Sequence, residues 1–411
     1  MRVGIFTDSY PPYINGVSTS ILMLKKGLEA KGHEVFVVCV NPKGAKTKYE
    51  EGGKVIRIPG IPIGIYDYRL SSIYSIKATK RIKKWNLDVI HSQTEWGIGT
   101  FARLIATQFK IPLVHTYHTM YEDYTHYITH GHFEKSSKKI VEYLTKFYCD
   151  KTIEELIVPT QKAYDLFKQK YKVARNIHII PTGIDVDKFK KRNLNLPRIH
   201  LLRKELGLTP DDFIVLFIGR LGKEKNVDFL IDGHRDLVKK HPNMKLVIVG
   251  SGPDSDEFKQ RVSRYHLNES IIFAGKVPFD DVPIYYNMAD AFVTASRTET
   301  QGLTVIEAMA SSLPVVCIDD ESFRGTIIND HNGFLFKNRR QYCRELIDLA
   351  TKPELYQRIS RQAKRDANQH SIKYFAEQVL DVYRLAIEEK RHSRFPWFGK
   401  IKAVIRGDVD E

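Results

Sequence analysis

The segment of residues 291–312 constrains the fold more than any other part of the chain. The mostly apolar run 291–295 predicts a buried strand, and residues 303–312 carry apolar side chains at helical spacing. Gly302 stands between the two. A buried strand that passes through a glycine turn into a helix is the repeating step of α/β proteins with parallel sheets.

The same alternation of strand and helix patterns runs along both halves of the chain. In the first half we expect strands at 3–6, 34–40, 55–58, 87–91, 112–116 and 177–180, and helices at 17–31, 70–85 and 96–109. In the second we expect strands at 213–218, 245–249, 271–274, 291–294 and 315–318, and helices at 227–240, 254–265, 303–312, 339–350, 354–369 and 372–390. This order predicts two doubly wound α/β domains.

The sequence Pro181-Thr182-Gly183 breaks the chain between these halves. We therefore expect a first domain at 1–182, a second at 183–370, a helix at 371–390 that returns to the first domain, and a tail at 391–411.

Composition narrows the class of protein. With 411 residues, 42% of them hydrophobic, the chain can bury two cores, and it contains no apolar run long enough to cross a bilayer. The first strand pattern begins at once, so we expect no secretory signal. Four widely spaced cysteines are expected to be reduced thiols in a cytosol: Cys39, Cys149, Cys317 and Cys343. A net charge of +15 predicts attraction to a polyanion, either nucleic acid or an anionic lipid surface.

Two carboxylates flank the glycine turn of the second half. Glu299 precedes the turn and Glu307 lies one turn inside the helix, where they can accept hydrogen bonds from sugar and ribose hydroxyls. The first backbone amides of the helix, at Gly302, Leu303 and Thr304, can bind phosphate or sugar oxygens. Two carboxylates at this spacing also occur on solvated helices, so the spacing alone leaves both interpretations open.

Three other glycine loops follow predicted strands, where open parallel sheets bind ligands. Gly16 opens the first helix, and the absence of a G-x-G-x-x-G pattern there argues against a nicotinamide dinucleotide. Gly219 is followed by Arg220 and Lys225, whose charges can neutralise a departing diphosphate or simply face solvent. Gly250 marks a further turn.

Histidines and tyrosines gather in residues 115–132. His126 and His130 have helical spacing and are compatible with zinc, but no third ligand of known spacing accompanies them. An aromatic and polar loop that reaches toward a ligand, with His118, Tyr121 and Tyr124, is the favoured interpretation.

Several of these pieces occur in an order that resembles a known family. They are Asn15-Gly16-Val17, His118, Pro181-Thr182-Gly183-Ile184-Asp185, Gly219-Arg220 with Lys225, and Glu299 with Glu307. Together, over about residues 1–390, they resemble family 4 of the retaining glycosyltransferases. The resemblance implies the GT-B architecture: two Rossmann-like domains with a cleft between them, the donor bound by the second, and a C-terminal helix that crosses back to the first.

The resemblance also implies roles for individual residues. Glu307 would bind the ribose hydroxyls, Glu299 the hexose, and the amides of residues 302–304 the sugar and phosphate. Arg220 and Lys225 would stabilise the leaving diphosphate, Gly16 would permit the domains to close on it, and His118 would support the reacting sugar. Electrostatic stabilisation is then the main contribution of the protein. The resemblance implies no metal site and no tightly bound cofactor, although Mg²⁺ can still stimulate activity.

The strings that begin at His118 and at Glu299 are similar to those of the bacterial subgroup that glucosylates diacylglycerol. This implies transfer of glucose from UDP-glucose to the 3-hydroxyl of 1,2-diacylglycerol, with an α-linked product, by a peripheral protein at the cytoplasmic face of the cell membrane.

Two segments suit contact with anionic membrane lipids. In the predicted helix around residues 73–85, Tyr74, Ala78, Ile82 and Trp85 share a face, with Lys77, Lys80, Arg81 and Lys84 beside or bordering it. The tail at 390–406 has six basic residues, no acid and three aromatic residues that include Trp397. The alternatives are ordinary helix packing for the first segment and a disordered basic tail for the second.

Other functions remain open at this point. A family 4 enzyme can use a glycolipid or a soluble acceptor, and a nucleotide-sugar epimerase shares the GT-B architecture. A nucleic-acid-binding protein would explain the charge, but the sequence contains no recognised nucleic-acid module, so no nucleic-acid partner is expected.

Overall fold

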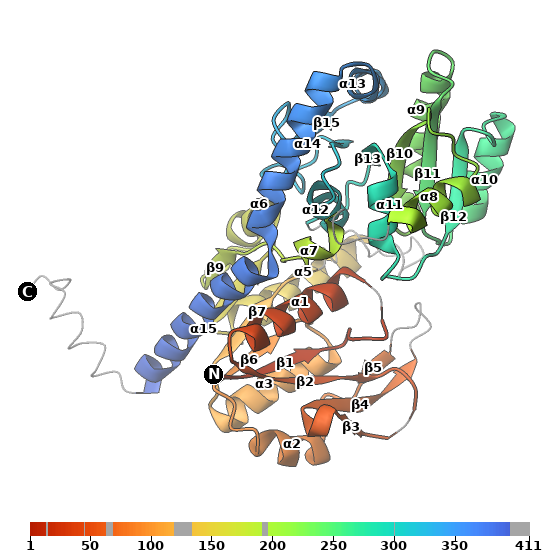
Figure 1. The fold of residues 1–411 in the computed structure, drawn as a ribbon. Helices are drawn as coiled ribbons and strands as arrows, with labels where there is room; N and C mark the ends of the chain where they lie inside the picture. The colour runs from red at the N-terminus through yellow and green to blue at the C-terminus, as the bar shows by residue number, and fades with distance from the viewer. Residues whose placement is uncertain are drawn as a thin grey trace, which may run out of the picture. The chain divides into compact units, whose positions relative to one another are not determined.

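The computed structural model describes residues 1–13, 15–44, 46–62, 69–118, 134–190, 196–299 and 301–394, without the side chains of 134–141 and 393–394. The chain divides into two compact units (Figure 1). Unit 1 is Met1–Gly183 together with Ile372–Glu411, and unit 2 is Ile184–Ser371. The last helix therefore belongs to unit 1, although it follows unit 2 in the sequence.

Unit 1 is built on one sheet. Its strands are β1 (Arg2–Thr7), β2 (Glu34–Asn41), β3 (Lys48–Glu50), β4 (Val55–Pro62), β5 (Arg69–Ser71), β6 (Val89–Ser92), β7 (Leu113–Thr116), β8 (Glu155–Val158) and β9 (Asn176–Ile179). In the part that the structure describes, their order is β3-β4-β2-β1-β6-β7-β8-β9, with β5 beside β4. β3 and β5 pair with β4 antiparallel, and the other pairs are parallel.

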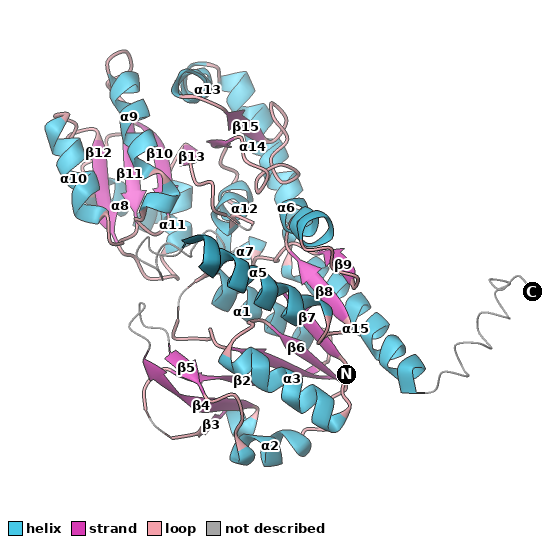
Figure 2. Cartoon of the chain, turned by 180° about the vertical axis from the view of Figure 1, so that it is seen from behind, coloured by secondary structure: helices cyan, strands magenta, loops and turns pink. Residues whose placement is uncertain are grey.

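Helices cover both faces of this sheet. They are α1 (Gly16–Ala30), α2 (Ile76–Lys83), α3 (Gly97–Phe109), α5 (Glu134–Asp150), α6 (Gln161–Asp165) and α15 (Ile372–Arg394). α1 and α15 lie along one face and α3 along the other (Figures 1 and 2). Alternate residues of β1 and β2 enter the two cores: Val3 and Val35 pack with α1 and α15, and Phe6 and Phe36 with α2 and α3. Alternation of side chains across a strand produces this division.

Two local contacts fix α15 on unit 1. Gly27 of α1 has no side chain, and a Cβ atom placed there would come within 2.7 Å of the Cβ of Ala376 on α15. His91 at the centre of the sheet has Nδ1 2.7 Å from the Tyr383 hydroxyl of α15 and Nε2 2.7 Å from the Thr116 hydroxyl. Burial lowers the pKa of His91 well below its ordinary value, so the ring is neutral.

Unit 2 has a second parallel sheet. Its strands are β10 (Phe213–Ile218), β11 (Met244–Val249), β12 (Ile271–Gly275), β13 (Ala291–Thr294), β14 (Val315–Ile318) and β15 (Gly333–Phe336). Their order is β12-β11-β10-β13-β14-β15, and every pair is parallel. The helices are α7 (Val186–Phe189), α8 (Leu196–Glu205), α9 (Val227–Val238), α10 (Ser255–Arg264), α11 (Val282–Met288), α12 (Leu303–Ala310), α13 (Arg339–Thr351) and α14 (Pro353–Ala367).

The expected α/β class with two doubly wound domains is confirmed, and most predicted elements differ from the observed ones by only a few residues. The helix predicted at 70–85 is wrong in its first part. Residues Arg69–Ser71 form β5, which pairs with β4, and the helix begins only at Ile76 after its N-cap Ser75. The pairing partner of a three-residue strand is set by tertiary contact, which the helical spacing of the segment conceals.

Candidate active site

The order of strands in unit 2 places the candidate site. Successive strands run outward from β10 in one direction through β11 and β12, and in the other direction through β13, β14 and β15. β10 and β13 are therefore neighbours at a topological switch point, where the loops after them diverge and leave room for a ligand. Lys225 follows β10 and Glu299 follows β13, so the fold brings these two predicted residues to one place.

Lys225 and Glu299 form an ion pair in which Nζ donates to Oε1. Burial opposes the charge of Glu299, but the Lys225 ammonium and the hydrogen bonds from Lys225 and Ser296 outweigh this effect, so the pKa of Glu299 is lowered. The Ser322 hydroxyl donates to the main-chain oxygen of Glu299 at 2.6 Å. Glu299 is therefore charged and held at both its side chain and its backbone.

Gly302 ends the loop and begins α12. Its φ of +75° lies in the left-handed region, and a Cβ atom there would lie 2.5 Å from the ring of Phe323. Glycine is the residue that fits both restrictions. Leu303 and Thr304 form the first turn of α12, whose N–H groups have no acceptor within the helix and point toward its open end. This turn provides donors and partial positive charge for an anion.

Glu307 lies one turn further along α12. The residue is only 7% exposed, and its Oε2 accepts a hydrogen bond of 2.9 Å from the Tyr286 hydroxyl. Burial raises the pKa of Glu307 to about 7 despite the hydrogen bond from Tyr286. The carboxyl is thus poised to gain charge when further donors reach it.

The loops after β10 and β11 support each other. Leu221 N–H donates to the Ser251 oxygen at 3.1 Å, and Lys223 N–H donates to the Asp254 carboxylate at 2.8 Å. Gly250 has a φ of +133°, and a Cβ atom there would lie 1.8 Å from the oxygen of Gly219. The close approach of the two turns therefore requires glycine at 250.

Arg220 projects from this pair of loops. Its side chain is one third exposed, and Nη1 lies 3.8 Å from the Glu224 carboxylate. This contact is an ion pair between residues one helical turn apart in sequence. A guanidinium carries its N–H donors in a planar fork that matches the oxygens of a phosphate.

Unit 1 carries the remaining predicted site residues. Gly16 is the first residue of α1, whose N-cap Asn15 accepts a hydrogen bond from Ser18 N–H at 2.9 Å. His118 follows β7 and is half-buried, and its Nε2 lies 2.6 Å from Oε1 of Gln93. Burial lowers the pKa of His118 to about 4, although the charge of nearby Glu95 acts in the opposite direction. The ring is neutral at pH 7.

The residues expected to meet a membrane divide into three groups. Lys77, Lys80 and Lys84 are exposed, and Arg81 is half-buried with Nη2 3.4 Å from the oxygen of Gly52. Trp85 is a correction, because it is only 4% exposed and stacks on Phe36 with ring centroids 4.8 Å apart. Ala78 and Ile82 of α2, which share the predicted face with Trp85, are also buried in the core of unit 1, in agreement with the alternative of ordinary helix packing. Tyr121, Tyr124 and Trp397 lie outside the described residues, as do His126 and His130.

Sequence reasoning missed three residues that shape these sites. Tyr286 orients Glu307, Ser322 holds the backbone of Glu299, and Gln93 contacts His118. Gln93 and Ser322 each follow within a few residues of a predicted parallel strand, and that position is the signal that was available. Tyr286 lies in α11, for which no motif was recognised.

Among the described residues, no group of three or more histidine, cysteine, aspartate or glutamate side chains is arranged to hold a metal ion. The four cysteines are free thiols, and Cys39, Cys149 and Cys317 are buried. No helix in the described part of the chain is both long and apolar enough to span a bilayer.

Two doubly wound units, with a switch-point site of carboxylates and cations in the second, define a transferase of the GT-B class. Comparison with family models gives the same result: the model described as "Glycosyltransferase Family 4" matches residues 14–188, and the model "Glycosyl transferases group 1" matches residues 199–366. The chain belongs to the family 4 glycosyltransferases and is a hexosyltransferase with the GT-B fold.

Its similarity to individual proteins extends over most of the chain. The α-monoglucosyldiacylglycerol synthase of Acholeplasma laidlawii is 34% identical over 389 residues, which are 93% of this chain and 96% of that protein. The enzyme of the same name from Streptococcus pneumoniae is 34% identical over 86% of this chain and 80% of its own. The structure of Anabaena HepE in complex with UDP has a TM-score of 0.72 and 18% identity, covering 93% of this chain and 99% of that one.

Proposed function

We propose that this glycosyltransferase transfers glucose from UDP-glucose to the 3-hydroxyl of 1,2-diacylglycerol and forms an α-linked monoglucosyl lipid at a membrane surface. The observation that carries the proposal is the 34% identity, over nearly the whole chain, to the synthase of A. laidlawii whose name gives α-monoglucosyldiacylglycerol as its product. The geometry of each unit supports particular parts of it.

The donor is bound by unit 2. Burial raises the pKa of Glu307. Hydroxyl donors such as those of a ribose would stabilise the ionised carboxylate and so bind to it. The first turn of α12 supplies N–H groups for sugar and phosphate oxygens. Arg220 and Lys225 supply two positive charges for the diphosphate.

Lys225 and Glu299 pair with each other in the structure, and each can also bind a part of the donor. A bound diphosphate competes with Glu299 for the Lys225 ammonium, because the phosphate oxygens also carry negative charge. Glu299 then becomes available to accept hydrogen bonds from the hexose hydroxyls. Donor binding and positioning of the sugar are thus coupled through one exchange of partners.

The transfer step needs little covalent chemistry from the protein. The bond from the anomeric carbon to the β-phosphate oxygen breaks, and the diacylglycerol oxygen bonds to that carbon on the same face. The hydroxyl proton of the acceptor passes to the departing phosphate oxygen, so atoms and charge balance. His118 supports the sugar as a neutral ring, while Arg220 and Lys225 stabilise the charge that develops on the diphosphate. We therefore also propose that no tightly bound cofactor or metal is required, and that Mg²⁺ at most stimulates turnover.

A diacylglycerol acceptor lies in a bilayer, and unit 1 presents a surface suited to one. Lys77, Lys80 and Lys84 are exposed on or beside α2, and Ile73 and Ile76 next to them are 59% and 66% exposed. Basic side chains beside exposed apolar ones favour the interface of an anionic leaflet. The protein is then a peripheral one, and its anchor differs from the expected face because Ile73 and Ile76 replace the buried Trp85.

The test is a panel of donors and acceptors. Purified protein is incubated with UDP-glucose, UDP-galactose or GDP-mannose and with liposomes that contain 1,2-diacylglycerol, and the extracted lipids are analysed by mass spectrometry. We expect a hexosyl-diacylglycerol with UDP-glucose, and its loss in the Glu307→Ala variant. Release of free hexose or an epimerised nucleotide without glycolipid would contradict the proposal. If product forms only with a glycolipid or a soluble acceptor and not with diacylglycerol, the enzyme belongs to another acceptor class of the family.

A further inference from the structure

Gln93 is a polar residue with no role so far, and its side chain contacts His118, which is proposed to support the reacting sugar. It follows β6, and its N–H donates to the oxygen of Phe6 on the neighbouring strand β1 at 2.8 Å. The side chain is 3% exposed. Backbone and side chain are therefore fixed by the sheet of unit 1.

The contact between Gln93 and His118 determines how the imidazole carries its proton. Oε1 of Gln93 lies 2.6 Å from Nε2 of His118, and a carbonyl oxygen can only accept a hydrogen bond. The neutral ring has one N–H, which this contact assigns to Nε2. Nδ1 is then left with a lone pair that can accept a hydrogen bond from a hydroxyl.

The amide nitrogen of Gln93 supplies a second observation. It is buried and has no hydrogen-bond partner among the described residues. An unpaired buried donor is costly, and a ligand oxygen beside it would remove that cost. The donor of Gln93 and the acceptor of His118 form a complementary pair for one hydroxyl group.

We propose that Gln93 is a positioning residue, which holds His118 as the Nε2–H tautomer and offers its own N–H to a hydroxyl oxygen of the substrate. This inference rests on the proposed role of His118 in glucosyl transfer. The titratable groups that interact with His118 among the described residues are Glu95, in the loop after β6, His115 on β7 and the neutral His91 on β6. The charge of Glu95 raises the pKa of His118, and His115 lowers it. The amide of Gln93 carries no charge, so it does not stabilise the imidazolium as a carboxylate at position 93 would.

The test compares Gln93→Glu and Gln93→Leu with the wild type. A carboxylate at position 93 also accepts from Nε2 but stabilises the imidazolium, so we expect the pKa of His118 to rise from about 4 by more than one unit. In Gln93→Leu the acceptor is lost, and turnover should fall by about tenfold with little change in KM for UDP-glucose. Gln108→Glu is the matched control, because Gln108 is exposed on α3 and keeps an acceptor for Tyr74.

Two readouts separate the failure of this inference from that of the proposed function. Nitrogen-15 NMR of the histidine rings reports the tautomer and pKa of His118 without any substrate, with the signal assigned by its loss in His118→Asn. A protonated Nδ1 in the wild type, or an unchanged His118 pKa in Gln93→Glu, overturns the inference whatever the acceptor is. Wild-type kcat in both Gln93 variants overturns it as well, whereas absence of glucosyl transfer in the wild type contradicts the proposed function alone.

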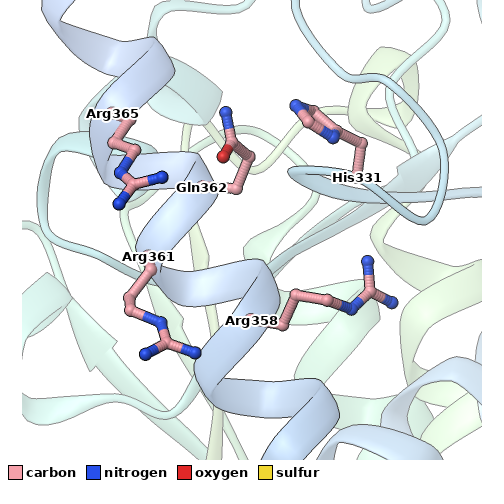
Figure 3. Close-up of a pocket in the computed structure, with 5 residues that line it drawn as sticks. All are labelled: His331, Arg358, Arg361, Gln362 and Arg365. Carbon is pink, nitrogen blue, oxygen red and sulfur yellow. The ribbon is translucent and has the colours of Figure 1, made fainter.

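A different observation points to a second binding site. A hollow of about 450 Å³ in unit 2 is lined by His331, Arg358, Arg361, Gln362 and Arg365, of which the last four project from α14 (Figure 3). None of the residues assigned to the donor lines it. The three arginines at positions 358, 361 and 365 follow helical spacing, so they share one side of α14.

The charges around this hollow are only partly balanced. Arg358 donates to the Asp330 carboxylate at 2.8 Å, and His331 lies 3.8 Å from Asp366. Arg361 and Arg365 have no ion-pair partner within the described ranges. Like charges at this spacing repel one another and destabilise a helix. A dianion would relieve the repulsion, and guanidinium groups match phosphate oxygens in geometry.

We infer that this hollow binds a phosphate-bearing anion, either as a free phosphate compound or as a lipid headgroup. The test titrates inorganic pyrophosphate by calorimetry in the presence of saturating UDP, which occupies the proposed donor site, and in a second arm measures flotation with liposomes that contain phosphatidic acid. Arg361→Gln/Arg365→Gln should weaken binding in one arm by about tenfold or more, which identifies the source. Lys239→Gln/Lys240→Gln removes the same charge from an exposed end of α9 and should not. Equal effects of the two double variants, or no binding in either arm, overturn the inference.

Discussion

Glu307 is the residue on which recognition of the nucleotide depends in this account. Replacement by alanine removes two proposed hydrogen bonds from ribose hydroxyls to a carboxylate, each worth about 1.5–3 kcal/mol, so the affinity for UDP should fall about a hundredfold or more. Calorimetric titration of UDP measures this directly. An unchanged affinity in a folded Glu307→Ala protein would remove Glu307 from the site.

The raised pKa of Glu307 gives a second prediction for the same residue. The carboxyl is protonated below about pH 7 and charged above it, and ribose hydroxyls donate to the charged form. Affinity for UDP-glucose should therefore rise as the pH increases through 7, and binding near pH 7 should release a proton. UDP-glucose is the suitable ligand because its diphosphate has no group that titrates there. Glu307→Gln should lose this dependence, and a wild-type affinity that is flat from pH 6 to 8 would contradict the assignment.

Glu299 and His118 are expected to act on turnover. Their proposed partners are the hexose and its transition state, so Glu299→Gln and His118→Ala should lower kcat by about a hundredfold at saturating donor. Glu299→Gln also releases Lys225 from its ion pair, so the affinity for UDP should not fall with kcat. Either variant working at the wild-type rate would show that the reacting centre lies elsewhere.

His234 tests how burial couples protonation to stability. The ring is fully buried in α9, and burial lowers its pKa to about 4, whereas an unfolded chain binds this proton near pH 6.5. The free energy of unfolding should thus fall as the pH drops from 6.5 toward 4, by about 2 kcal/mol at pH 5 from this residue.

The comparison for His234 is between variants, because Glu307 has a raised pKa and acts in the opposite direction in every protein compared. The free energy of unfolding, measured with urea, should fall less between pH 7 and pH 5 in His234→Leu than in the wild type. His200→Leu, on the exposed side of α8, should behave as the wild type. Equal acid sensitivity in His234→Leu and the wild type would contradict the account.

Among the elements, α1 and α15 make the contact that returns the end of the chain to unit 1. Gly27→Val places a branched side chain where the Ala376 Cβ and Ile372 already lie within 3 Å, so unit 1 should lose about 1–3 kcal/mol of stability. Ala30→Val places a valine at an exposed position of the same helix, where it meets no packed neighbour and where its lower helix propensity than alanine costs at most about 0.7 kcal/mol. Denaturant unfolding followed by tryptophan fluorescence is the measurement, and equal midpoints for the two variants would contradict tight packing at Gly27.

The elements also show what sequence can predict. Strands such as Phe213–Ile218 are buried on both faces, and their continuous apolar runs identify them directly. The pairing of Lys225 with Glu299 agrees with the strand order, since the sequence pattern places each residue after a parallel strand and the two strands, β10 and β13, are neighbours. Side-chain direction was harder to predict: the face that carries Trp85 has the pattern of an amphipathic surface helix, and the neighbouring Phe36 that buries it is distant in sequence. Gln93 was missed because its importance depends on its contact with His118.

At the scale of the whole molecule, the net charge of +15 favours binding to an anionic membrane. The proposed membrane contact further requires that basic side chains on one particular surface carry most of this effect. Lys77→Gln/Lys80→Gln/Lys84→Gln removes three exposed charges that can each contribute up to about 1 kcal/mol near an anionic leaflet, although the contributions do not add fully. We expect weaker flotation with anionic liposomes at low salt. The control removes three exposed lysines from unit 2, at positions 239, 240 and 259. Equal flotation of both triple variants would show that net charge alone determines membrane binding, and would contradict a specific membrane surface around α2.

The tail beyond residue 394 is a separate candidate for the membrane contact. Lys390 pairs with Glu154 at 2.6 Å and α15 continues to Arg394, so a cut after residue 394 preserves the packing that a cut after 389 removes. The shortened protein should keep UDP affinity and float less with anionic liposomes, because the surface around α2 remains. Unchanged flotation at low salt would leave the exposed surface around α2 as the anchor.

The anomeric configuration of the lipid product tests the central claim most directly. Protein is incubated with UDP-glucose labelled with carbon-13 at the anomeric position and with diacylglycerol in liposomes, and the purified glycolipid is examined by proton NMR. The account predicts a single glucose on the 3-oxygen of diacylglycerol with the small anomeric coupling of an α-linkage. A β-linked product, or label recovered only as free glucose or nucleotide, would contradict it.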